Sequence, residues 1–100
     1  MDKEKKRELR RAFRDAERLA FIDRMPLLPA IARQLFDRLE EQLGLEGCRH
    51  DFRLTTRCCQ DYVIDEACVM AWLNAEGAGC DCEVLANVED RLTDAMEALQ

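Results

Sequence analysis

The chain is organised around residues 79–88, which read Gly79-Cys80-Asp81-Cys82-Glu83-Val84-Leu85-Ala86-Asn87-Val88. The stretch supplies two cysteines separated by one residue, followed by a run that contains two β-branched valines. β-Branched residues that come soon after a glycine turn favour an extended conformation. We therefore expect a strand over 82–88, with a continuous helix over 82–99 as the competing interpretation.

An earlier segment alternates in polarity and offers a partner for this strand. In residues 50–55, His50, Phe52 and Leu54 would share one face of an extended chain, opposite a face of charged residues. This period of two is typical of a half-buried strand. The two segments together predict a small two-stranded antiparallel sheet.

Two pairs of metal-binding residue types lie at the starts of these segments. In extended chain, residues two apart point to the same side, so Cys48 pairs with His50 and Cys80 pairs with Cys82. If the segments lie side by side, three sulfurs and one imidazole nitrogen converge, which is a usual ligand set for structural zinc. The sequence therefore predicts a metal site at Cys48, His50, Cys80 and Cys82 with zinc as the cofactor, although iron remains possible.

The cysteines also permit other interpretations. Free cysteine is among the most buried residue types, and Cys68 lies on an apolar helical stripe that is expected to be core. Of the adjacent Cys58 and Cys59, one is expected to be buried and the other exposed, and either could replace His50 as a ligand. A redox pair at Cys80 and Cys82 is a further alternative, but a disulfide that spans one residue is strained.

The rest of the chain reads as helices. Leu9, Phe13, Ala16 and Ala20 form one apolar face of a charged helix over 3–24. The segment 25–29 contains two prolines, and the second is well placed to begin a helix that runs to about Leu43 and ends at Gly44. These two helices are expected to pack as an antiparallel hairpin.

Later in the chain, a short helix is expected through Cys58, Cys59 and Tyr62, and Asp65 should cap another helix. A C-terminal helix over 92–99 completes the pattern. The expected fold is a single α+β domain over 1–100, with an N-terminal helical hairpin, further helices and the small sheet around the Cys/His site.

Length and charge restrict the class of protein. One hundred residues is enough for one domain, with 48% hydrophobic and 36% charged residues. Residues 1–24 carry nine Lys/Arg against six Asp/Glu, whereas 25–100 carry six against fifteen. An acidic body disfavours duplex DNA as the main partner. Neither a signal peptide nor a membrane span is apparent, so a cytoplasmic protein is expected.

The pattern Cys48-x-His50 followed by Cys80-Asp81-Cys82-Glu83-Val84-Leu85-x-Asn87-Val88 resembles a family of small, mainly bacterial proteins classed as a domain of unknown function. The charged first helix, the Met25-Pro26 turn and Leu35-Phe36-Asp37 extend the likeness over most of the chain. Arg49 and the Cys58-Cys59 pair depart from the family's pattern. The resemblance implies a shared fold and site, and it implies no activity.

Three functions are compatible with these observations. The first is a small zinc-binding domain in which the metal is structural and the partner is a protein, with a homodimer possible through the first helix. The second is a thiol-based redox protein or metal-dependent enzyme that uses the same cysteines, with Glu83 as a possible base. The third is a nucleic-acid adaptor that works through the basic N-terminal helix. The chain has no serine, so a serine-based catalytic triad is excluded.

Overall fold

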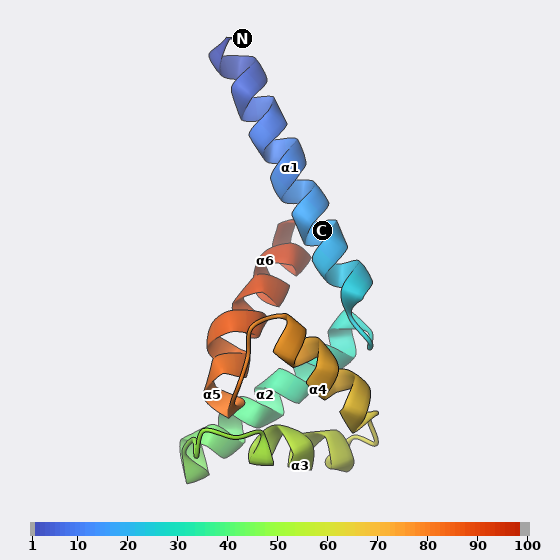
Figure 1. The fold of residues 1–100 in the computed structure, drawn as a ribbon, viewed down its shortest axis with the longest axis vertical. Helices are drawn as coiled ribbons and strands as arrows, with labels where there is room; N and C mark the ends of the chain where they lie inside the picture. The colour runs from blue at the N-terminus through green and yellow to red at the C-terminus, as the bar shows by residue number, and fades with distance from the viewer. Residues whose placement is uncertain (1, 99–100) are drawn as a thin grey trace.

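The computed structural model describes residues 2–98, and within this range the chain is all helical (Figure 1). The helices are α1 (Lys3–Arg24), α2 (Pro29–Glu46), α3 (Arg53–Asp61), α4 (Glu66–Ala75), α5 (Asp81–Glu83), the π-helical segment η1 (Val84–Glu89) and α6 (Asp90–Ala98). The last three follow one another without a break and form one continuous helix. No helix in residues 2–98 is both long and apolar enough to cross a membrane.

The predicted α+β fold with a two-stranded sheet is therefore wrong. Residues 50–52 are loop and 53–55 begin α3, while residues 82–88 are helical. Helix prevails over 82–88 because Val84 and Val88 are spaced four residues apart in line with Leu92, so all three are buried on one face. The π-helical turn of η1, with its i→i+5 hydrogen bonds, still places Val84 and Val88 on the same side of the helix. Burial on that face outweighs the weak strand preference of two valines.

The first two helices do not form the predicted hairpin. The helix over 3–24 is confirmed as α1, but α1 packs mainly along α6, and α2 continues away from it beneath α4 (Figure 1). Pro29 begins α2 as predicted, whereas the helix runs on past Gly44 to Glu46. Gly47, with φ of 72°, ends it in the left-handed region that glycine tolerates best.

The core lies where α2, α3, α4 and the C-terminal helix meet. It is mainly aliphatic, and the largest fully buried side chains include Leu35, Leu39, Leu54 and Leu73. Trp72 of α4 stacks on Phe36 at 6.3 Å between ring centroids. The ring centroid of Phe21 in α1 lies 6.0 Å from that of Trp72, so Phe21 joins α1 to the core.

Two predictions about cysteines are corrected by burial. Cys68 is exposed rather than core, and Cys58 and Cys59 are both fully buried rather than divided between core and surface. The apolar face of α1 is turned to solvent, since Leu9 is 57% and Phe13 67% exposed. Within the described residues the first fully buried side chain is that of Phe21, and the N-terminal half of α1 extends beyond the body (Figure 1).

Candidate metal centre

The structure brings the four predicted ligand residues together, although no strands carry them. Cys48 and His50 lie in the loop between α2 and α3, whereas Cys80 caps α5 and Cys82 lies in its first turn. One ligand atom of each of Cys48, His50 and Cys80 lies within 4.8 Å of the other two. The Sγ atoms of Cys80 and Cys82 are 3.3 Å apart. Ligand atoms of Cys48, His50 and Cys80 therefore converge between a loop and a helix start, and the Cys82 sulfur lies beside that of Cys80.

The loop backbone is distorted at the histidine. His50 adopts φ of 61°, a left-handed conformation that few non-glycine residues take. Such backbone costs roughly 1–3 kcal/mol and persists where the surroundings demand it. Here it accompanies the turn that places the imidazole beside the sulfur of Cys48. Gly47 immediately precedes this turn and supplies the other left-handed residue of the segment.

Hydrogen bonds to the Cys48 sulfur favour its charged form. The backbone N–H groups of Cys82 and His50 both donate to it and lower the pKa of the Cys48 thiol. In contrast, the neighbouring sulfurs of Cys80 and Cys48 raise the pKa of Cys82 to about 12. Crowded thiols of this kind cannot all ionise next to one another without a cation. Backbone N–H groups directed at sulfur also tune metal-bound thiolates.

Asp81, between the two cysteines, fixes the position of the second pair, and the sequence did not reveal this role. Its side chain is fully buried and accepts hydrogen bonds from the backbone N–H of Leu54 at 3.0 Å and of Thr55 at 2.9 Å. The Thr55 hydroxyl donates a third bond at 2.7 Å. The carboxylate therefore caps the N-terminus of α3 from across the site.

A backbone bond completes this link between the two halves of the site. The N–H of Asp81 donates to the carbonyl of Asp51 at 2.8 Å, which joins the α2–α3 loop to the start of α5. Phe52, the residue before α3, cannot cap the helix with its side chain, and within residues 2–98 the Asp51 side chain accepts only from the N–H of Arg53. The N–H groups of Leu54 and Thr55 therefore need an acceptor from elsewhere in the chain, which Asp81 supplies.

Glu83 stabilises the start of α5 through contacts with Gly79 and Cys80. Its Oε1 accepts a hydrogen bond from the N–H of Gly79 at 3.0 Å and lies 3.6 Å from the Cys80 sulfur. A side chain at position 79 would bring its Cβ within 3.1 Å of this oxygen, so glycine fits best there. Glu83 is thus engaged in capping, which argues against a role as a free base.

The other three cysteines lie outside the cluster. Burial raises the pKa of Cys58, and it raises the pKa of Cys59 to about 11, so both are inert core thiols. The exposed Cys68 has a raised pKa because it is hydrogen-bonded to Asp65, which caps α4 as predicted. None of them replaces His50 in the group of converging ligand atoms.

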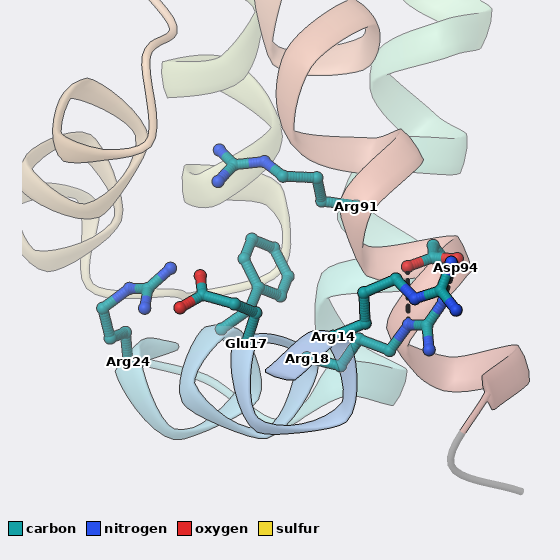
Figure 2. A pocket seen from close by; sticks show the side chains of 7 residues that line it. Arg14, Glu17, Arg18, Arg24, Arg91 and Asp94 are labelled. Carbon is teal, nitrogen blue, oxygen red and sulfur yellow. Dashed lines mark hydrogen bonds and ion pairs between the residues drawn. The ribbon is translucent and has the colours of Figure 1, made fainter. Parts of the chain in front are cut away.

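A second polar feature is a pocket of about 200 Å³ between α1 and α6, at the place where α1 packs on the body (Figure 2). Four arginines line it, but three already have carboxylate partners. Arg18 donates to Asp94 at 2.9 Å, and Arg24 and Arg91 both donate to Glu76 at 2.7 Å. The guanidinium groups are therefore occupied in holding α1 against the body, which leaves little capacity for an external anion.

Comparison with known proteins identifies the chain's relatives. The family model described as "Protein of unknown function (DUF2695)" matches residues 35–87, the segment that includes all four candidate ligands. "Uncharacterized protein Mb2294" of Mycobacterium bovis and "Uncharacterized protein Rv2271" of Mycobacterium tuberculosis are each 35% identical to this chain over 88 residues. The match covers 88% of this chain and 89% of each relative. No solved structure matches significantly.

The family match spans more than half of the chain and coincides with the Cys/His cluster and the capping contacts around it. The expected resemblance to a bacterial family of unknown function is thereby confirmed. The chain belongs to the DUF2695 family of proteins of unknown function.

Proposed function

We propose that the chain is a small zinc-binding domain in which Cys48, His50, Cys80 and Cys82 hold a structural zinc ion. The observation that carries this proposal is the convergence of four ligand side chains from two distant segments. Three sulfurs and one imidazole nitrogen would fill all four positions of tetrahedral zinc. A filled coordination shell has no open position for substrate, so the metal would act on stability rather than on a reaction.

The architecture around the site supports a structural role. The ion would join the α2–α3 loop to the start of α5, at the place where Asp81 already ties α5 to α3. A small domain buries a limited fraction of its surface, and a metal is a common additional source of stability. Zinc supplies folding free energy directly, because its binding site exists only in the folded chain.

The biological role that fits such a domain best is protein binding. The body has an acidic balance, and α1 extends from it with a basic balance and an exposed apolar face. Exposed apolar residues beside charges are typical of surfaces that bind other proteins. The metal would then fix the framework that presents this surface, without taking part in the contact itself.

Metal content of the purified chain tests the proposal. Elemental analysis should find one zinc per chain in the wild type, and loss of zinc in the Cys80→Ser and Cys82→Ser variants. Cys68→Ser is the matched control, because Cys68 is an exposed cysteine outside the cluster, and this variant should keep its zinc. Equal zinc in all four proteins, or none in freshly reduced wild type, would contradict the proposal.

A thiol-based redox function is the second candidate, and one observation favours it. The Cys80 and Cys82 sulfurs are 3.3 Å apart, and Cys82 is exposed. Iodoacetamide labelling followed by mass spectrometry separates the two functions. A structural zinc site predicts that Cys68 reacts while the cluster reacts only after a chelator removes the metal. A redox site predicts rapid labelling at the cluster in the untreated protein.

A further inference from the structure

Helix α1 has two faces with different surroundings. Arg14, Arg18 and Phe21 line the contact with α6, so they define the side of α1 that faces the body. With 3.6 residues per turn, Leu9 falls on the side away from this contact, and Phe13 lies between Leu9 and Glu17, which also lines the pocket. Leu9 and Phe13 are both exposed and lie in the N-terminal half of α1.

One side of α1 carries an apolar stripe with large residues at its N-terminal end and small residues at its C-terminal end. Leu9 and Phe13 lie towards the N-terminus, and the small Ala16 and Ala20 continue the stripe towards the C-terminus at steps of three and four residues. Within residues 2–98 no other element covers Leu9 or Phe13. We propose that this stripe binds α1 of a second copy of the chain in antiparallel orientation, which forms a two-helix dimer contact.

Antiparallel pairing matches large residues with small ones. In the register that opposes Leu9 to Ala20 of the second copy, Phe13 meets Ala16, and the twofold axis repeats both contacts. Every layer of the contact then holds one bulky and one small side chain, which allows close packing. Parallel pairing would instead stack Phe13 on Phe13 and leave a gap where alanine meets alanine.

The residues beside the stripe fit the same register. Arg10 and Glu17 lie seven residues apart along one flank, so each would face the opposite charge of the second copy. Neither forms an ion pair within the described part of the chain. On the other flank Ala12 would meet Leu19, which accounts for the 51% exposure of Leu19. Parallel pairing would bring Lys5 against Arg10, a repulsive contact.

The shape of the molecule allows this contact. The N-terminal half of α1 extends beyond the body (Figure 1), and Leu9, Phe13 and Ala16 of the stripe are exposed, whereas Ala20 is partly buried. The two bodies would therefore lie on opposite sides of the helix pair without collision. One pair of helices buries less than a standard interface of about 1,600 Å², so we expect a dissociation constant in roughly the micromolar range.

Sedimentation equilibrium of the zinc-loaded full chain, from micromolar to millimolar protein, tests the contact. The wild type should show a monomer–dimer equilibrium, and Phe13→Glu should remain monomeric. Arg11→Gln is the matched control, because it makes the same charge change on the side of α1 away from the stripe, and it should dimerise as the wild type does. Circular dichroism checks that Phe13→Glu keeps its helices, as expected for a residue without core contacts.

A charge exchange tests the orientation independently. Arg10→Glu should weaken the antiparallel dimer at least about fivefold, because it opposes Glu17 at two symmetric positions. The double variant Arg10→Glu/Glu17→Arg should restore it. A wild type that stays monomeric at millimolar concentration would overturn the proposal, as would dimers that Phe13→Glu leaves intact or that Arg10→Glu strengthens. A monomer that binds acidic lipid vesicles through Phe13 would overturn it in favour of a membrane surface.

Discussion

Asp81 is the residue on which the geometry of the candidate site depends most. It accepts three hydrogen bonds while fully buried, and it stands between the two cysteines of α5. Adjacent side chains therefore point in different directions: Cys80 and Cys82 turn towards the loop that holds Cys48, and Asp81 turns inwards to α3. The sequence predicted the ligands from their types and spacing, but it did not predict Asp81, because its partners are mostly backbone groups 26 and 27 residues away.

Replacement of this carboxylate should be costly. Asp81→Asn keeps the shape but turns one acceptor into a donor that faces N–H groups, and we expect a loss of about 2–3 kcal/mol in the free energy of unfolding. Urea denaturation measures this loss. Zinc affinity should also fall roughly 10–100-fold, as for other residues that orient metal ligands.

Asp51→Asn provides the matched control for this change. Asp51 is exposed and accepts one side-chain bond, from the N–H of Arg53 at 3.1 Å, in the same loop. Its replacement should cost no more than about 1 kcal/mol. If the two variants were equally stable, Asp81 would not be the link between α3 and α5 that its contacts indicate.

At the scale of helices, the attachment of α1 depends on its last turns. Phe21 packs on Trp72, and Glu76 of the α4 C-terminus accepts hydrogen bonds from Arg24 of α1 and Arg91 of α6. The sequence predicted the length of α1 well, because charge and periodicity define it locally. It did not predict that α1 packs on α6 instead of forming a hairpin with α2, because the attached side is rich in arginine while Leu9 and Phe13 face solvent.

Deletion of residues 1–12 should therefore leave the body intact. None of residues 2–12 is buried, so we expect the free energy of unfolding to stay within about 0.5 kcal/mol of that of the full chain. The zinc content should remain one ion per chain. Phe21→Ala in the full chain should instead cost about 3–5 kcal/mol, because it removes a packed aromatic residue. Thermal and urea unfolding of the two variants make the comparison, and a larger loss from the deletion would show that the N-terminal half of α1 packs on the body.

The Glu76 contact should give a measurable pH dependence. Burial opposes ionisation of this carboxyl, but the hydrogen bonds and charges of Arg24 and Arg91 outweigh it and lower the Glu76 pKa below its ordinary value of 4.5. A lowered pKa in the folded state stabilises the protein above the unfolded pKa, and this contribution is lost as pH falls through the folded value.

Comparison of the wild type with Glu76→Gln isolates this contribution. At pH 7 the variant should be less stable by about 1–2 kcal/mol, and the difference should shrink as pH is lowered below about 4.5. Both proteins share the same zinc site, so loss of metal in acid affects them alike. A difference that stayed constant between pH 7 and pH 3 would show that the Glu76 charge does not contribute to stability.

At the scale of the whole molecule, the helices could be predicted and their arrangement could not. The breaks at Pro26 and Pro29 and the cap at Asp65 are local features, and the structure contains them. The choice between strand and helix at 82–88 depended on which surface Val84 and Val88 would bury, and that surface is made by distant helices. The proximity of Cys48, His50 and Cys80 could be predicted without the correct fold, because residues two apart can also share a side in a loop or at a helix cap.

We propose that Cys48, His50, Cys80 and Cys82 bind one zinc ion together. X-ray absorption at the zinc K-edge of the zinc-loaded chain tests this proposal, because it reports ligand types and distances. We expect three sulfur neighbours at about 2.3 Å and one nitrogen at about 2.0–2.1 Å, and His50→Cys should convert this to four sulfurs with zinc retained. A shell rich in oxygen, or one that His50→Cys leaves unchanged, would contradict a site made by Cys48, His50, Cys80 and Cys82.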